Sequence, residues 1–391
     1  MLGRQVRHEL VALVRSPVSV LLTLVFPVAF FVLLASLFGN ETLDERGGIR
    51  MAQFLAPGMA TFGVAMATFS FLAVGVAQAR VSGALKRQSG TPLPGWVRGG
   101  GRLGASTVLG TVATALVLGV GVAGYQLQLY GRSIVTVVVT LLLGSFAFGA
   151  LGLALGSAFS SAQSTIAAAN GFVIPLSFVS DVFMSSSQMP DWLARIASFF
   201  PLKHVAALLG AALDPYASGS GLAADHLAVL VAWGVGGALA ATWAMRRDPS
   251  RGRARVGRRR HRPADAVPRR GPLPSSGVLV AQVRHSLLAL LRDPSAVFFA
   301  VAFPVLLVAV IPAANGGGDI DVDGRPLDGL IAVTMAVYGS AVTAYLNMPV
   351  DMVENRDRRV LDRLAGTPLP NSAMLAGRVT GAVLIGSVTL L

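Results

Sequence analysis

The feature that most constrains this chain is a succession of apolar blocks, each about 20 residues long, separated by short polar or glycine-rich stretches. A helix of about 20 residues crosses the hydrocarbon core of a bilayer, and inside lipid a helix satisfies all its own backbone hydrogen bonds. A hydrophobic content of 53%, a charged content of 13% and a mean hydropathy of +0.65 exclude an ordinary soluble protein. The sequence therefore predicts an all-α, polytopic transmembrane helix bundle.

The first part of the chain predicts six membrane-spanning helices. They cover residues 17–39, 53–79, 103–127, 133–159, 163–185 and 223–245. Between the fifth and the sixth, Met189 to Pro215 mixes apolar residues with Asp191, Arg195 and Lys203. We expect short amphipathic helices at or dipping into the outer interface here, with an ordinary extracellular loop as the alternative.

The net charge of +13 is concentrated in alternate connections. Arginines gather before the first span, after the second, and in the run from Arg246 to Arg270. This asymmetry predicts a cytoplasmic N-terminus. No aromatic residues interleave the basic run, so nucleic acid is not an expected partner. Abundant Arg, Ala and Gly with little Lys is typical of a GC-rich bacterial genome, so the expected location is a bacterial inner membrane.

An internal repeat divides the chain. The segment QVRHELVALVRSP at 5–17 recurs as QVRHSLLALLRDP at 282–294, and SGTPLP at 89–94 recurs as AGTPLP at 365–370. Phe26-Pro27 recurs as Phe303-Pro304, and Arg102 corresponds to Arg378. Such recurrence indicates duplication. We predict a first unit over 1–245, a basic disordered linker over 246–276 and a partial second unit over 277–391.

The second unit predicts spans near 295–314 and 328–350, and a third from Ala373 that is still apolar at Leu391. Either a fragment or a truncated tandem would give this pattern.

The segment before each unit's first span is amphipathic. Leu2, Val6, Leu10 and Leu13 share one helical face, so we expect the helix to lie along the cytoplasmic membrane surface. It is either a positive-inside anchor or a lever that touches a cytoplasmic partner. Its candidate basic residues in the two units are Arg4, Arg7, Arg15, Arg284 and Arg292.

The connection between the second and third spans is the second candidate site. In the second unit a charged helix from Glu354 to Leu364 is expected to end at Gly366, and two prolines stiffen the return to the membrane. Gln78 occupies the aligned position of Glu354. The connection is either a tight inside loop or a protrusion that presses on another protein. Its candidate contact residues are Arg80, Lys86, Arg87, Glu354, Arg356, Arg358, Arg359 and Arg363.

Taken together, the surface helix, Pro57-Gly58 in the second span, the stretches LKRQSGTPLP and LDRLAGTPLP, and MPDWLARIASFFPLKHV resemble the ABC-2 type permeases, which include bacterial drug and antibiotic exporters. The resemblance implies a six-helix permease unit, a pathway formed with a second permease copy, and a loop after the second span that rests on an ABC ATPase subunit.

No GxxxxGK[ST] phosphate loop is present, so ATP would bind to that partner and the chain needs no cofactor of its own. The expected cargo is a drug-like metabolite, a lipid or a lipid-linked glycan.

The rival functions are a non-transporting membrane scaffold or sensor and, less favoured, an intramembrane enzyme. The chain has no cysteine and no paired histidine motif, so neither a metal site nor a catalytic residue is expected. In the fifth span Asn170 and Pro175 either line the pathway or kink the helix. The glycines of the fourth span, Gly144, Gly149, Gly152 and Gly156, are expected to be close-packing positions.

Overall fold

The computed structural model describes residues 1–15, 20–37, 39–43, 48–159, 161–183, 190–217, 219, 221–246, 275–314, 321–322, 325–357, 360 and 371–388. The chain divides into two compact units, Met1–Asp248 with Val310–Gly318, and Pro249–Ala309 with Asp319–Leu391. Of the predicted linker over 246–276, residues 247–274 lie outside the described residues. The prediction is wrong at its two ends, because Arg246 is the last residue of one helix and Ser275 and Ser276 begin the next.

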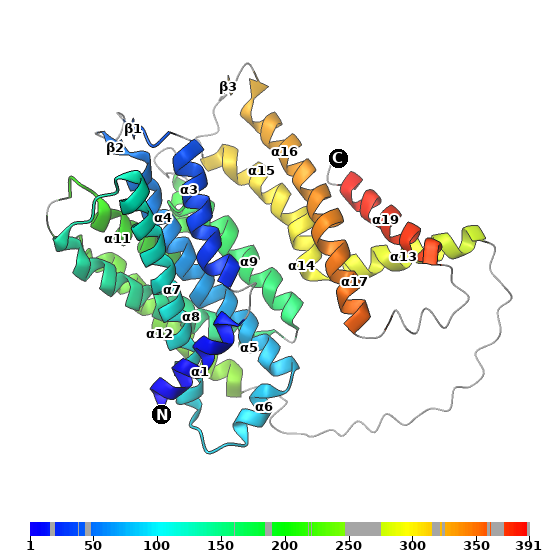
Figure 1. The fold of residues 1–391 in the computed structure, drawn as a ribbon, viewed down its shortest axis with the longest axis horizontal. Coiled ribbons are helices and arrows are strands. Elements are labelled where there is room, and N and C mark those ends of the chain that lie inside the picture. Colours follow the sequence, from blue (N-terminus) through cyan, green and yellow to red (C-terminus); the bar gives the residue numbers. More distant parts are fainter. Residues whose placement is uncertain are drawn as a thin grey trace. The chain divides into compact units, whose positions relative to one another are not determined.

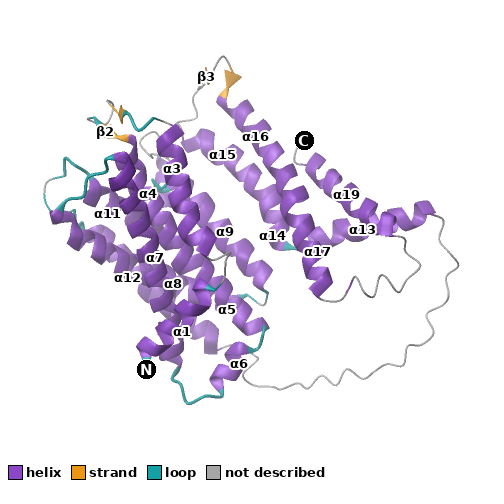
Figure 2. Cartoon of the chain, viewed as in Figure 1, coloured by secondary structure: helices purple, strands orange, loops and turns teal. Residues whose placement is uncertain are grey.

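The first unit is almost entirely helical, with one two-stranded hairpin (Figures 1 and 2). Strand β1 (Thr42–Leu43) pairs antiparallel with β2 (Ile49–Arg50). The helices are α1 (Leu2–Val14), π-helical η1 (Leu21–Val25), α3 (Phe26–Leu37), α4 (Met51–Ala65), π-helical η3 (Met66–Phe71), α5 (Leu72–Val81), α6 (Ala84–Ser89), α7 (Gly95–Tyr125), 3-10 helix η4 (Gly131–Ser133), α8 (Ile134–Ala158), α9 (Ala162–Val179), α10 (Asp191–Phe199), α11 (Pro201–Leu213) and α12 (Ala224–Arg246).

The second unit repeats the opening of this order. Its hairpin pairs β3 (Asp321–Val322) with β4 (Arg325–Pro326). Its helices are α13 (Ser275–Leu291), α14 (Pro294–Val297), π-helical η7 (Phe298–Ala302), α15 (Phe303–Ala314), α16 (Leu327–Ala341), π-helical η8 (Val342–Asn347), α17 (Met348–Asp357) and α19 (Asn371–Val388).

Helices long and apolar enough to cross a membrane confirm the polytopic α-helical prediction. Within the described residues there are seven: Met51–Val81, Gly95–Tyr125, Gly131–Ala158, Ala162–Val179, Ala224–Met245, Pro294–Pro312 and Gly329–Val353. Helices α10 and α11 form a further pair, bent by 92°. They confirm the short helices predicted between the fifth and sixth spans.

The third span begins at Gly95, eight residues before the predicted start at 103. The sequence GWVRGGG disfavours a helix locally, because glycine has low intrinsic helix propensity. In the structure α1 packs along this first part of α7, so tertiary packing stabilises a helix that propensity alone would not.

The π-turns fall at positions that the sequence repeat aligns. In η1 the amide of Phe26 donates to the carbonyl of Leu21, and in η7 the amide of Phe303 donates to that of Phe298. Each turn directly precedes a Phe-Pro pair. Because proline has no N–H and its ring displaces the carbonyl four residues earlier, a bond to the fifth residue back relieves the clash.

Helix α8 lies at the centre of the first unit, against α12, α5, α11 and α7. An added Cβ at Gly152 would lie 2.7 Å from the main-chain oxygen of Phe69, and one at Gly156 would lie 2.4 Å from that of Ala73. Only glycine permits these helix–helix approaches. The prediction that the glycines of this span are close-packing positions is confirmed.

Candidate functional site

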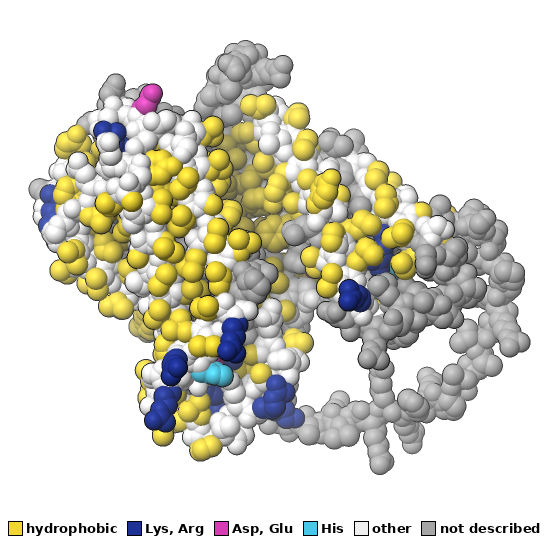
Figure 3. All heavy atoms as spheres, viewed as in Figure 1, with side chains coloured by type: hydrophobic (Ala, Val, Ile, Leu, Met, Phe, Trp, Pro, Cys, Tyr) yellow, Lys and Arg dark blue, Asp and Glu magenta, His cyan; other side chains and the backbone are white. Residues whose placement is uncertain are grey.

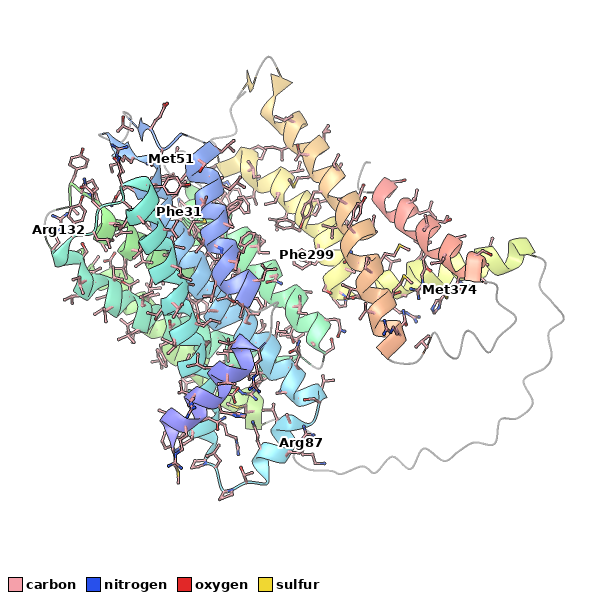
Figure 4. The ribbon with its side chains drawn as sticks, in the orientation of Figure 1. Phe31, Met51, Arg87, Arg132, Phe299 and Met374 are labelled. Atoms are coloured by element: carbon pink, nitrogen blue, oxygen red, sulfur yellow. The ribbon has the colours of Figure 1, made fainter. Side chains whose placement is uncertain are left out.

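The loop between α5 and α7 forms one end of the first unit. Gly83 has a φ of +70°, a conformation that suits glycine, and it separates α5 from the short helix α6. Lys86 and Arg87 of α6 are exposed. Lysine and arginine side chains gather around α1 and α6, below a broad apolar flank, and Arg87 lies at the opposite end of the unit from Arg132 (Figures 3 and 4).

Arg80 fastens the base of this loop to α8. Its guanidinium donates to the main-chain oxygens of Ser157 at 2.6 Å and Phe159 at 3.0 Å. These carbonyls stand at the C-terminal end of α8, where a helix has unsatisfied acceptors and a negative partial charge. Arg80 therefore acts in this structure as a helix cap, whereas Lys86 and Arg87 face outward.

Arg98 braces the second half of the loop. It donates to the carbonyls of Gln88 at 3.1 Å and Leu93 at 2.9 Å. The hydroxyl of Thr91 also donates to the carbonyl of Gln88, at 2.7 Å. The loop is thus held at both ends by arginine, and the exposed cationic side chains of Lys86 and Arg87 lie on a braced protrusion.

Helix α1 packs on the glycine-rich start of α7. An added Cβ at Gly101 would lie 2.3 Å from Cγ of Gln5, and one at Gly104 would lie 2.9 Å from Cγ2 of Val6. Leu2 and Val6 of the predicted apolar stripe therefore contact α7, together with the polar Gln5, and the placement of α1 at the membrane surface stays a prediction. Arg4, Arg7 and Arg15 are exposed.

In the second unit α13 packs on α19 in the same way. An added Cβ at Gly377 would lie 2.5 Å from Cγ of Gln282. Arg284 and Arg292 on α13 are exposed, as is Arg356 near the end of α17. Arg358, Arg359 and Arg363 lie outside the described residues, as does the side chain of Glu354. Its counterpart Gln78 is exposed.

The two candidates in the fifth span lie in α9. Pro175 lies inside the helix, and Oδ1 of Asn170 is buried without a hydrogen-bond partner among the described residues. Such an acceptor is costly in an apolar setting, which is compatible with a polar pathway. That role stays a prediction.

A histidine pair lies between α11 and α12, where sequence reasoning found none. Nδ1 of His204 lies 2.6 Å from Nδ1 of His226, and Nε2 of His204 lies 2.7 Å from the carbonyl oxygen of Ser198. The two residues are 22 positions apart, and no local spacing rule links them. Only the turn of α11 back onto α12 brings them together.

Side chains from neighbouring helices hydrogen-bond to and pack against the sharp bend between α10 and α11. Nε1 of Trp233 donates to the carbonyl of Phe199 at 2.7 Å, and Phe200 packs against both Phe172 and Trp233. A broken helix inside a bilayer needs such partners for its freed carbonyls. No group of three or more acidic, histidine or cysteine side chains suited to a metal occurs in the part of the chain that the structure describes.

The family model described as ABC-2 family transporter protein matches residues 48–243, half of the chain. The matched segment includes the α5–α7 loop, the bent pair α10–α11 and most of α12. Neither the curated proteins nor the solved structures contain a match to the chain.

Proposed function

We propose, since the chain belongs to the ABC-2 transporter family, that it is the membrane permease of an ATP-driven exporter whose ATPase is a separate polypeptide. The observation that carries the proposal is the braced loop of the first unit. Arg80 and Arg98 hold it by main-chain hydrogen bonds, and the exposed side chains of Lys86 and Arg87 would meet an acidic surface of the partner.

A rigid protrusion transmits force better than a mobile loop. A push on α6 would pass through Arg80 to α8, the helix at the centre of the first unit. Closure of an ATPase dimer would then shift the helices around α8, so that the pathway opens alternately to the two sides of the membrane. ATP would be bound and hydrolysed only on the partner.

An apolar pathway with few charges suits a hydrophobic or amphipathic cargo: a drug-like metabolite, a lipid or a lipid-linked glycan. In this proposal the chain lies in a bacterial inner membrane with its N-terminus in the cytoplasm, and a second permease copy completes the pathway.

The test is charge reversal of the protrusion. Lys86→Glu/Arg87→Glu should reduce co-purification with the cognate ATPase at least fivefold and abolish ATP-dependent export from inverted vesicles. Arg50→Glu, an exposed arginine in β2, is the matched control. The pair Arg358→Glu/Arg359→Glu should uncouple hydrolysis from export through the second unit.

Normal export by the variant with all four charges reversed would refute the coupling role. Stable ATPase binding without any transported substrate would favour the scaffold or sensor alternative.

A further inference from the structure

Each third span contains a buried arginine at an aligned position, Arg102 in α7 and Arg378 in α19. The side chains are only 11% and 8% exposed. A charge this far removed from water needs an acidic partner or main-chain acceptors. Both arginines have an acidic partner, but the two partners come from different elements.

In the first unit the acid belongs to the surface helix. Nε of Arg102 lies 3.5 Å from Oε1 of Glu9, whose side chain is 16% exposed. Nε2 of Gln5 donates to the same oxygen at 2.8 Å. Helix α1 is therefore fixed to α7 by an ion pair as well as by the close contact at Gly101.

In the second unit the repeat aligns Ser286 with Glu9, so α13 has no carboxylate at this place. Nη1 of Arg378 instead lies 3.4 Å from Oδ2 of Asp351 in α17, an ion pair without a hydrogen bond, to a side chain that is 46% exposed. Nδ2 of Asn355 donates to the other oxygen of that carboxylate at 2.8 Å. The first unit has Gly75 at the position of Asp351. One acid has been lost and another gained, so each arginine remains paired.

From this exchange we infer that the two units anchor different elements to the third span. In the first unit the anchored element is the surface helix α1. In the second unit it is α17, the helix that leads into the loop after the second span. The inference deepens the proposed function, because under that function a push on the helix that precedes the loop reaches the third span through an ion pair in the second unit, whereas the ion pair of the third span in the first unit goes to α1. In the first unit, movement of the third span is linked to α1.

Spin labels on introduced cysteines test the anchoring without any transport assay, and the chain has no native cysteine. In the first unit the labelled positions are His8 on α1 and Val81 on α5, and in the second they are His285 on α13 and Val353 on α17, all exposed. Glu9→Gln should raise the mobile spectral fraction at least twofold at position 8 and leave position 81 unchanged. Asp351→Asn should raise the mobile spectral fraction at least twofold at position 353 and leave it unchanged at position 285.

Exchange of the acids gives the sharper test. Glu9→Ser/Gly75→Asp should mobilise a label at position 8, as Glu9→Ser alone does. It should immobilise a label at Val81 relative to Glu9→Ser alone. An added Cβ at Gly75 meets no atom within 4 Å, so the substitution has room. Glu41→Gln, which removes an exposed acid elsewhere in the first unit, is the matched control for fold and insertion.

Equal mobility changes at both labelled helices of a unit, or none at either, would overturn the inference. The labels respond in the purified chain without nucleotide or ATPase. If the labels behave as expected but export does not depend on an ATPase, the proposed function is wrong and the difference in anchoring stands.

Discussion

Removal of the Arg80 guanidinium is the perturbation whose outcome the structure defines most closely. Arg80→Met keeps a long apolar stem and deletes the two bonds to the carbonyls of Ser157 and Phe159. Hydrogen bonds to a charged group contribute about 1.5–3 kcal/mol each, and because Arg80 is half-buried we take the lower value for both. The loss is then about 3 kcal/mol.

Thermal unfolding in detergent, followed by tryptophan fluorescence, measures this loss. For a unit of this size about 1 kcal/mol corresponds to about 2–4 °C, so the Tm of Arg80→Met should fall by about 6–12 °C. Arg87→Met is the control, because the Arg87 side chain is exposed and its bond to the carbonyl of Ser82 spans 3.2 Å. Its Tm should fall by less than about 2 °C.

Trypsin gives a local measurement of the same change. Cleavage at Lys86 and Arg87 requires the loop to open, and Arg80→Met removes its attachment to α8. Cleavage should therefore accelerate at least fivefold in this variant. An unchanged Tm together with an unchanged cleavage rate would refute the role of Arg80 as the loop's anchor.

Three further outcomes concern other parts of the first unit. Gly58→Ala should lower stability by about 3 kcal/mol in thermal unfolding, since its Cβ would lie 1.9 Å from a main-chain oxygen after α9, whereas Gly75→Ala should not destabilise. Gln53→Leu should lower Tm by about 5–10 °C, because three hydrogen bonds to main-chain groups are lost. A cysteine at Asn40 should react with an impermeant thiol reagent from outside intact cells and one at Ser82 should not; the reverse pattern would contradict the predicted topology.

Much of the fold was predictable because lipid makes the hydropathy signal strong. Spans such as α8 and α12 are long apolar runs, and their boundaries agree with the sequence prediction to within two residues. The start of α7 was not predictable. Its three consecutive glycines disfavour a helix locally, and what stabilises it is the packing of α1, whose Gln5 lies 96 positions before Gly101.

The sequence identified the segment that forms the candidate site, but it identified only part of what the side chains of that segment do. Recurrence of TPLP marked the loop, but composition alone could not separate the capping arginine, Arg80, from the outward-facing Arg87. Likewise, the alignment of Arg102 with Arg378 gave no sign that their acids differ. A pairing between helices distant in sequence leaves no periodic signal, so only the structure could assign Glu9 and Asp351 to their arginines.

The two ends of the first unit satisfy their main-chain groups with different chemistry. At the end that holds α6, Arg80 and Arg98 cap carbonyls with charged groups. At the end that holds the β1–β2 hairpin, the amide of Gln53, only 7% exposed, donates to the carbonyls of Gln128 and Leu213.

The predicted orientation, with the end that holds α6 in the cytoplasm, would account for the difference. A buried arginine at the outer end would oppose the predicted orientation during insertion, whereas a neutral amide supplies donors without adding charge. Arg132, the arginine that bonds carbonyls at the hairpin end, is exposed and can stay in contact with water. The choice of donor at each end therefore follows the predicted side of the membrane, and it leaves the stronger, charge-assisted bonds where an ATPase would exert its force.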